Sequence, residues 1–275
     1  MWRGLYTAAS GMITETKRTD TIANNLANAD TSGYKRDLAI SGEFEKMLIK
    51  RINDYDERYD ITAFKGFHVG DSRPRVGDLG MGSYIDEIAT DLGQGAMETT
   101  GNQLDVAISG NGYFAVQTPE GVRYTRDGAF FRSAANGQLQ TTLGQPVLNR
   151  QGRPINIPQN ATSISFGPKG EVFVHQAGGD PPPLALIGQL QFVEFDDRRA
   201  LLKQGNNLWR PQEGAQPRPA TGTIEQGVLE RSNANVVEEM VELVNNYRIY
   251  EAGSKAVVSQ DELLDKAVNE VGRLS

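Results

Sequence analysis

Apolar residues recur at helical spacing at both ends of the chain, and the spacing changes between them. Residues 3–28 and 235–273 carry apolar side chains three and four positions apart, the period of one face of an α-helix. The intervening residues are rich in glycine and in short β-branched or aromatic runs. The pattern predicts an α+β protein that is mainly β, with long N- and C-terminal helices paired as a coiled coil, an inserted β-rich domain and extended connections.

The C-terminal segment has the more regular pattern. Counted in heptads from Met240, eight of ten seam positions are apolar or aromatic, which is typical of a coiled coil. Asn235, with Glu238 three residues later, predicts an N-cap and its reciprocal partner. Additional valines widen the apolar face at the helix start, as expected for a helix with more than one neighbour. The seam positions are Met240, Leu243, Tyr247, Tyr250, Ser254, Val257, Asp261, Leu264, Val268 and Val271.

The N-terminal segment repeats this pattern more weakly. Ile13 and Ile22 lie beside its seam, and the small residues in the seam would permit a close approach of two helices. On pattern alone, an ordinary two-helix hairpin packed against the β region explains the two segments as well as a coiled coil does. The seam positions are Leu5, Ala9, Met12, Thr16, Thr19, Ala23 and Leu26.

The middle of the chain predicts short strands separated by turns rich in Gly, Pro and Asn. We expect strands at Leu104–Ser109, Tyr113–Gln117, Val122–Arg126, Gln138–Thr142, Ser163–Phe166, Glu171–His175 and Leu190–Phe195. The predicted organisation is an N-terminal helix in 1–34, an extended Gly-rich connection in 35–97, a β-rich domain in 98–210, a proline-stiffened linker in 211–234 and a C-terminal helix in 235–275.

Composition narrows the function classes. The chain has 28 basic and 35 acidic residues, a net charge of −7, and so carries no electrostatic footprint for a nucleic acid. It has no Cys, so disulfides and thiolate metal sites are excluded. No apolar run is long enough for membrane insertion, and the N-terminus lacks the basic stretch and apolar core of a secretory signal. By these signals alone the chain looks cytoplasmic.

Candidate chemistry is sparse. The histidines His68 and His175 stand in no metal-ligand spacing. Ser32 and Lys35 formally match the Ser-x-x-Lys of penicillin-binding enzymes, but no Ser-Asp-Asn or Lys-Thr-Gly follows. We therefore predict a protein that is not an enzyme, with no catalytic, cofactor-binding or metal-binding residues. The carboxylates that would be considered as paired acids, but for which surface or turn roles are commoner, are Asp127, Glu194, Asp196 and Asp197.

One run of residues indicates the protein's class more specifically than any of these features does. Residues 23–35 read Ala-Asn-Asn-Leu-Ala-Asn-Ala-Asp-Thr-Ser-Gly-Tyr-Lys, and singly its Asn and Gly residues predict only a helix end and a turn. As a whole the run resembles the signature of the bacterial flagellar rod and hook protein family, in which an Asn-Asn-Leu-Ala-Asn helix end leads into a Thr-x-Gly-Tyr/Phe-Lys turn. Further stretches fit the same family in order: Gly4–Met12, Asp105–Phe114 with Tyr124–Gly128, Leu229–Met240 and Tyr250–Ala256.

The resemblance implies a structural subunit of the flagellar basal-body rod, of proximal or distal type. Such a subunit self-assembles helically with copies of itself and with related rod and hook proteins into the axial drive shaft that carries torque across the cell envelope. The resemblance also implies uncleaved export through the flagellar type III apparatus to the extracytoplasmic basal body. The expected assembly interface comprises Leu5, Met12, Ile22, Asn24, Asn25, Leu26, Asn28, Gly33, Tyr34, Met240, Leu243, Tyr247, Tyr250, Val257, Leu264 and Val268.

The main alternative is a secreted carbohydrate-binding or adhesin-like β domain on a coiled-coil stalk, and a peptidoglycan-cleaving enzyme is a more distant one. A fixed small trimer would favour the stalk. End-to-end assembly with related but non-identical subunits would favour the rod.

Overall fold

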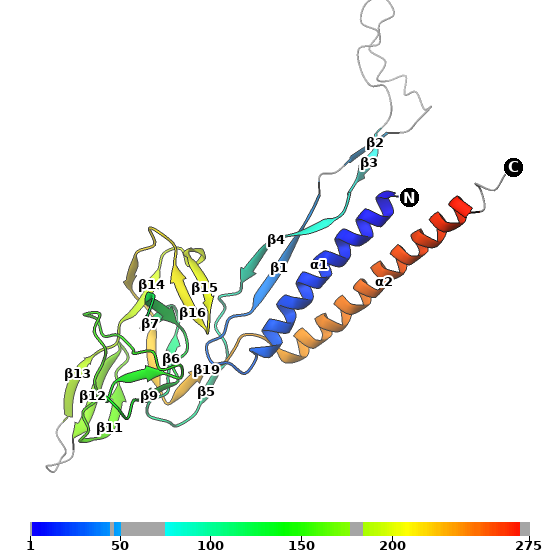
Figure 1. The fold of residues 1–275 in the computed structure, drawn as a ribbon. Coiled ribbons are helices and arrows are strands. Elements are labelled where there is room, and N and C mark those ends of the chain that lie inside the picture. The colour runs from blue at the N-terminus through cyan, green and yellow to red at the C-terminus, as the bar shows by residue number, and fades with distance from the viewer. Residues whose placement is uncertain (1, 45–46, 51–74, 177–183, 270–275) are drawn as a thin grey trace, which may run out of the picture. The chain divides into compact units, whose positions relative to one another are not determined.

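The computed structural model of the protein describes residues 2–44, 47–50, 75–176 and 184–269. Helix α1 (Trp2–Ala27) begins the chain, helix α2 (Val236–Asn269) ends it, and the described strands lie between them in sequence (Figure 1). This confirms an α+β chain that is mainly β. Neither described helix has the length and apolar character needed to cross a membrane.

The chain divides into two compact units. The helical unit comprises Met1–Ala23, Asp37–Ala89 and Met240–Ser275. The β unit comprises Asn24–Arg36 and Thr90–Glu239, so it includes the turn that follows α1. His68 and residues 51–59, a run dense in charged side chains that the sequence predicts to be a solvated surface, lie outside the described residues.

In the helical unit α1 and α2 lie side by side and run in opposite directions (Figure 1). The residues of α2 that contact α1 are spaced one heptad apart, which keeps them on one face of the helix. Gly253 allows a close approach, because a Cβ atom there would lie 2.9 Å from Cγ of Met12. The contacts pair Asn246 with Glu15, Gly253 with Met12, and Gln260 with Gly4.

The start of α2 has the predicted N-cap. The side-chain Oδ1 of Asn235 accepts a hydrogen bond from the N–H of Val237 at 3.0 Å, and its carbonyl accepts one from Glu239 at 2.9 Å. The expected reciprocal bond from Glu238 is not formed among the described residues. The Glu238 carboxylate instead lies 4.0 Å from Nη1 of Arg36.

Residues 35–97, predicted as an extended connection, contain paired strands. β1 (Asp37–Glu43) pairs with β4 (Ser83–Thr90), and β2 (Met47–Lys50) pairs antiparallel with β3 (Arg75–Leu79). The Oγ of Ser83 donates to Oγ1 of Thr14 on α1 at 3.1 Å. The Gly-rich sequence therefore forms a two-stranded ribbon alongside the first helix.

The β unit is organised around a six-stranded sheet in the order β15-β16-β8-β7-β14-β17 and a three-stranded sheet in the order β11-β12-β13. Each of the seven predicted strands overlaps an observed one. The strands of the larger sheet are β15 (Leu201–Gly205), β16 (Leu208–Pro211), β8 (Gly121–Thr125), β7 (Tyr113–Thr118), β14 (Phe192–Phe195) and β17 (Pro217–Pro219). The smaller sheet comprises β11 (Ala161–Phe166), β12 (Glu171–Gln176) and β13 (Leu184–Gln189).

Three two-stranded pairs complete the β unit, and two of them use residues 211–234, the predicted linker. Its prolines do not prevent pairing, because β17 is an edge strand and an edge tolerates residues without an N–H. The pairs are β18 (Thr223–Gln226) with β6 (Val106–Ser109), β19 (Val228–Glu230) with β5 (Met97–Thr99), and β10 (Leu139–Thr141) with β9 (Phe130–Arg132).

Strand β7 separates two hydrophobic clusters. Phe114 and Val116 point into the larger cluster, and Tyr113 and Ala115 point into the smaller one, as the period of two in a strand requires. All four are buried, so β7 is covered on both faces. Trp209 on β16 is 2% exposed and belongs to the smaller cluster.

We expect the larger cluster to set the stability of the β unit. Leu139 is fully buried, whereas Leu143, in the turn that follows it, is 57% exposed. Leu139→Ala should lower the free energy of unfolding by about 2–5 kcal/mol, and Leu143→Ala by no more than about 0.5 kcal/mol. Urea denaturation of the two variants measures both values, and equal effects would contradict this assignment of the core.

Candidate functional site

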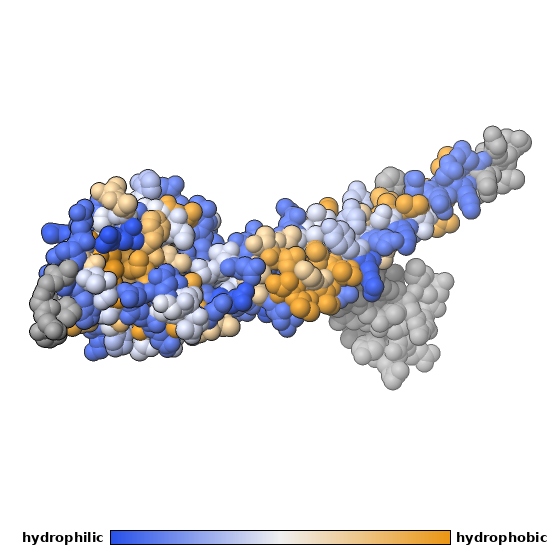
Figure 2. Space-filling model, turned by 90° about the horizontal axis from the view of Figure 1, so that it is seen from below, coloured by the Kyte–Doolittle hydropathy of each residue, from blue (hydrophilic) through white to orange (hydrophobic). Residues whose placement is uncertain are grey.

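Helix α2 exposes part of the face that the sequence predicts to be buried on a partner. On α2, Leu243, Val257 and Leu264 are half-buried, whereas Met240 is 50% and Tyr247 is 58% exposed. Figure 2 shows a hydrophobic patch on the helical part of the molecule. The uncovered apolar side chains on the helical unit's part of α2 include Met240, Val241, Val244, Tyr247, Ile249, Tyr250, Val258, Leu263 and Val268.

The row of α2 residues that contacts α1 differs from the predicted seam at alternate positions. The predicted seam residues Leu243, Val257 and Leu264 are half-buried, and the residues that contact α1 lie between them. The positions between them are Asn246, Gly253 and Gln260 instead of residues one step later on the helix. Polar and small residues occupy these inner positions, which leaves the valines and Met240 at the start of α2 on the outside.

On α1, Ile22 is buried and Leu5, Met12 and Leu26 are half-buried. The rest of the predicted interface lies in the last turn of α1 and in the turn after it, both within the β unit. There Asn25, Gly33 and Tyr34 are buried, Asn28 is half-buried and Asn24 is exposed.

Asparagine side chains hold the end of α1. The Nδ2 of Asn28 donates to the carbonyl of Asn24 at 2.8 Å, in the last turn of the helix. The hydroxyl of Tyr34 lies 3.0 Å from Oδ1 of Asn24 and 3.2 Å from Oδ1 of Asn25, and it bonds back to the helix end. The Asn-Asn-Leu-Ala-Asn sequence is therefore used for its side-chain hydrogen bonds as well as for its turn propensity.

Gly33 lies where no other residue fits. Its φ is +66°, and a Cβ atom would lie 2.6 Å from the backbone carbonyl carbon of Arg126. Its N–H donates to the carbonyl of Glu230 at 2.7 Å. Glycine is required here both by the left-handed backbone and by the approach of another chain segment.

Beside this turn lies a buried ionic cluster of Lys35, Arg126 and Glu230, which we call the Glu230 cluster. The carboxylate of Glu230 is 2.5 Å from Nζ of Lys35 and 3.0 Å from Nη1 of Arg126. The three side chains are 1%, 6% and 0% exposed, in the order Lys35, Arg126 and Glu230. One acid therefore compensates two cations in the buried interior of the β unit.

Backbone groups supply further hydrogen bonds to the Glu230 cluster, although the buried Nε of Arg126 has no partner among the described residues. The carbonyl of Gly93 accepts from Lys35 at 2.7 Å, the carbonyl of Gly110 accepts from Arg126 at 2.6 Å, and the N–H of Gly95 donates to Glu230 at 2.9 Å. Burial lowers the pKa of Lys35, although Glu230 opposes this by stabilising the ammonium. The cluster joins the turn after α1 to strand β19 and to the end of β8.

Ser32 and Lys35, the formal Ser-x-x-Lys pair, have separate partners. The hydroxyl of Ser32 donates to Oδ1 of Asp127 at 2.5 Å, whereas Lys35 is committed to Glu230. In the Ser-x-x-Lys motif the lysine assists the serine, whereas here Ser32 and Lys35 are hydrogen-bonded to different acids. Burial raises the pKa of Asp127, while the bonds from Ser32 and from the N–H of Ala129 oppose that shift.

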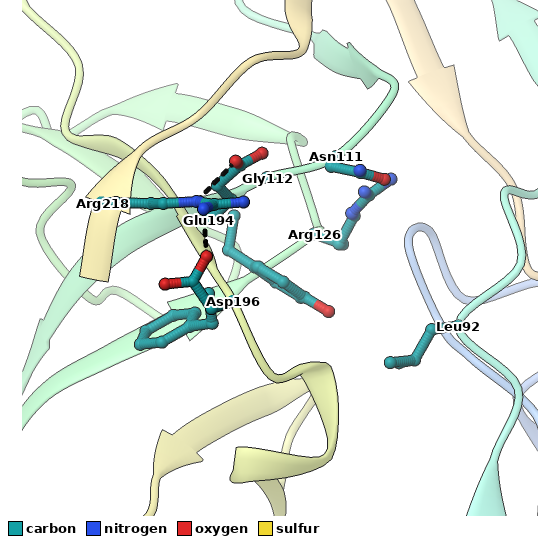
Figure 3. Close-up of a pocket in the computed structure, with 9 residues that line it drawn as sticks. Leu92, Asn111, Gly112, Arg126, Glu194, Asp196 and Arg218 are labelled. Carbon is teal, nitrogen blue, oxygen red and sulfur yellow. Dashed lines mark hydrogen bonds and ion pairs between the residues drawn. The ribbon is translucent and has the colours of Figure 1, made fainter. Parts of the chain in front are cut away.

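A small cavity of about 100 Å³ lies beside the Glu230 cluster, and Arg126 lines it together with Glu194, Asp196 and Arg218 (Figure 3). The guanidinium of Arg218 lies between the two acids, donating to Glu194 at 2.8 Å and pairing with Asp196. Burial would raise the pKa of Glu194, but hydrogen bonds from Thr221 and Arg218 outweigh it and hold that pKa below its ordinary value. Glu194 therefore serves as an ionised acceptor and is poorly suited to act as a general acid.

Sequence reasoning gave no role to Arg126, Glu230 or Lys203. The Nζ of Lys203 donates to the carbonyl of Lys35 at 2.5 Å and lies 4.5 Å from the centre of the Tyr34 ring. Arg126 and Glu230 fall inside stretches that resemble the flagellar family, and that resemblance was the available signal. Charge alone would have placed all three on the surface.

Removing the shared acid tests the Glu230 cluster. Glu230→Gln leaves two buried cations without a countercharge, so we expect the free energy of unfolding to fall by about 3–5 kcal/mol. Glu225→Gln, an exposed position on β18, is the matched control and should change it by no more than about 0.5 kcal/mol. Urea denaturation of both variants measures the difference; a similar small change in both would show that the cluster is not what holds the turn.

The pKa of Asp127 predicts a pH dependence. Because this pKa is raised in the folded protein, the folded state binds a proton at a higher pH than the unfolded state does. Protonation of Asp127 therefore stabilises the folded state at low pH, and this stabilisation is lost as pH rises through the folded pKa. Asp127→Asn has no titrating group at this position, so it cannot gain stability by binding a proton there. Its free energy of unfolding relative to wild type should therefore be higher at about pH 7 than at about pH 4. Paired urea titrations at the two pH values measure this, and the opposite trend would contradict it.

Models of known protein families match three regions of the chain. A model described as flagella basal body rod protein matches residues 5–35, one described as flagellar hook protein FlgE/F/G D1 domain matches 107–174, and one described as flagellar basal body rod FlgEFG protein C-terminal matches 225–270. Lys35, Arg126 and Glu230 therefore come from three separately matched regions.

Full-length relatives agree with these matches. The chain is 34% identical over 272 residues to flagellar basal-body rod protein FlgG of Buchnera aphidicola subsp. Acyrthosiphon pisum, covering 95% of this chain and 97% of the relative. It is 33% identical to FlgG of Bacillus subtilis (98% and 99% covered) and 33% identical to flagellar basal-body rod protein FlgF of Caulobacter vibrioides (100% of both). The chain belongs to the flagellar basal-body rod protein family and is a structural subunit of the basal-body rod.

Proposed function

We propose that this rod subunit assembles helically with copies of itself and with related rod and hook proteins, using the uncovered faces of its terminal helices. In this proposal the helices pair as a coiled coil, and the assembled shaft carries torque across the cell envelope. The subunit reaches the basal body through the flagellar export apparatus. The observation that carries the proposal is the apolar face of α2 that α1 leaves uncovered.

That face lies at the beginning of α2. Successive residues of a helix are rotated by about 100°, so Met240, Val244 and Tyr247 fall on one side, away from the row of Asn246 and Gly253. They are 50%, 51% and 58% exposed, respectively. Exposed apolar residues standing singly are ordinary, but several on one helical face mark an interaction surface.

Burial of this face supplies the association energy. Each large aliphatic side chain taken from water contributes about 1.5–3 kcal/mol. In a filament every subunit makes the same contact, and because the contact joins different surfaces of neighbouring copies it propagates instead of closing into a dimer. Weak individual contacts are then multiplied along the rod.

The pairing of α1 with α2 supports the coiled-coil part of the proposal. Asn246, Gly253 and Gln260 repeat at seven-residue intervals and face α1. A polar residue at an inner position lowers stability but fixes the register of two helices. Asn246 approaches the carbonyl of Glu15 to 3.5 Å, which suits such a role.

A charge on the uncovered face should separate folding from assembly. Val244→Asp lies on an exposed surface of the isolated subunit, so its circular dichroism and urea midpoint should match those of wild type. In cells, the aspartate would have to be buried against a neighbour, and the chain should be missing from purified basal bodies and motility should be lost. Asn245→Asp, one residue away on another side of α2 and also exposed, is the control and should assemble. Normal motility of Val244→Asp would refute the proposed use of this face.

A further inference from the structure

The β unit contains two Asn-Gly dipeptides: Asn111-Gly112, just before β7, and Asn136-Gly137, just before β10. In an Asn-Gly sequence the asparagine readily loses its side-chain amide, because glycine has no side chain to hinder attack by its main-chain nitrogen. Both asparagines are exposed to water. The structure nevertheless gives the two sites different hydrogen bonds, so they are expected to differ in reactivity.

At Asn136 the reacting groups are held by hydrogen bonds. Its Nδ2 donates to Oε1 of Gln138 at 2.8 Å, and its Oδ1 accepts from the N–H of Gln138 at 3.2 Å. The N–H of Gly137, which would have to lose its proton, donates to the carbonyl of Ser133 at 2.9 Å. Attack at this site requires these bonds to break first, and each of them slows the reaction.

At Asn111 the same groups are not held. Among the described residues, neither the side-chain amide of Asn111 nor the N–H of Gly112 forms a hydrogen bond. The carbonyl of Asn111 accepts the N–H of Gly222 at 3.3 Å, which is longer than is usual for such a bond. The nitrogen of Gly112 can therefore approach the side chain of Asn111 without first breaking a strong hydrogen bond.

Arg126 lies beside the amide of Asn111. Its Nη2 donates to the carbonyl of Gly110 at 2.6 Å, and Arg126 and Asn111 line the same small cavity (Figure 3). The acids of that cavity are paired with Arg218. When the nitrogen of Gly112 attacks, negative charge develops on the side-chain oxygen of Asn111, and a fixed guanidinium nearby favours that charge.

We propose that Asn111 is a site of spontaneous deamidation in the folded protein. The nitrogen of Gly112 loses its proton to water and forms a bond to Cγ of Asn111, which closes a cyclic imide. The Cγ–Nδ2 bond breaks, and Nδ2 takes up a proton from water and leaves as ammonia. A water molecule then opens the imide. Overall one water is consumed and one ammonia is released, and nothing is oxidised or reduced.

The imide has two carbonyls, so two products form. Opening at Cγ gives aspartate with a normal main chain, and it places a carboxylate beside Arg126, whose buried Nε has no partner among the described residues. Opening at the main-chain carbonyl gives isoaspartate, which adds one carbon to the main chain just before Gly112. That position is tightly packed, because a Cβ atom on Gly112 would overlap the ring of Phe192. The aspartate form should therefore be tolerated and the isoaspartate form should strain the entry to β7.

Ageing of the purified full-length chain tests the proposal. The folded protein is incubated at mildly alkaline pH and digested, and mass spectrometry quantifies the peptides that contain Asn111 and Asn136. We expect Asn111 to deamidate about tenfold faster than Asn136, or more. In concentrated urea neither site keeps its hydrogen bonds, so the two rates should agree within about threefold. Equal rates in the folded protein, a faster reaction at Asn136, or deamidation of Asn111 in urea alone would overturn the proposal.

Variants of the two sites give the second test. Asn111→Gln is the matched control, because its longer side chain closes the imide much more slowly, and it should abolish labelling of this peptide by an isoaspartate-specific methyltransferase. Gln138→Ala removes a partner of Asn136 and should speed deamidation there while leaving Asn111 unchanged. Labelling that persists in Asn111→Gln, or an unchanged Asn136 in Gln138→Ala, would contradict the mechanism.

The effect on the fold is measured on the separated products. Asn111→Asp reproduces the aspartate form, and its urea midpoint should be no lower than that of wild type. The isoaspartate form, purified from aged protein, should have a lower midpoint, and the reverse order would contradict the account of the two products. All of these measurements use the isolated chain, so they do not depend on assembly into a rod, and Val244→Asp should deamidate at Asn111 at the wild-type rate.

Discussion

The rest of the structure depends on one buried carboxylate. Glu230 is fully buried and neutralises Lys35 from the turn after α1 and Arg126 from the end of β8. Burying these charges carries a desolvation penalty that their attraction only partly offsets, so the cluster is a poor source of net stability. The cluster instead favours one arrangement of the chain. Any arrangement that separates the segments carrying Lys35, Arg126 and Glu230 leaves a buried charge without a partner.

Further hydrogen bonds near Glu230 connect the end of α1 and the turn after it to the residues that lead into α2. The carbonyl of Glu230 also accepts the N–H of Gly33, and Asn233, just beyond Glu230, accepts the N–H of Arg36 at 2.8 Å. The Nδ2 of Asn25, at the end of α1, donates to Oε2 of Glu239 at 3.3 Å. These bonds hold the last turn of α1 beside the first turn of α2.

Part of this could be predicted from the sequence, and the reasons for success and failure are physical. Helix ends are local: Asn235 caps α2 and the Asn-rich run ends α1 because each bonds backbone groups a few residues away. Which residues of α2 face α1 is not determined by nearby sequence. Heptad counting cannot choose between a row with Tyr247 and one with Asn246, and the choice depends on Gly253, whose missing Cβ admits Met12 of the other helix. Likewise Pro217 and Pro219 suggest a linker by composition, whereas pairing with β14 at a sheet edge depends on residues far away in sequence. The Glu230 cluster escaped prediction because its charged side chains are ordinarily found on surfaces.

The distribution of polarity along α2 connects the fold to the function. A helix that had to stabilise only the single subunit would bury its valines against α1 and expose its asparagine and glutamine. Here Asn246 and Gln260 face α1, while Val241 and Val244 are 55% and 51% exposed. The inner row fixes register at some cost in stability, and the larger apolar area stays available for a neighbour. Under the proposed assembly, the free energy that the isolated subunit forgoes is recovered only when copies associate, so a subunit of this design would have its terminal helices stabilised mainly within the rod.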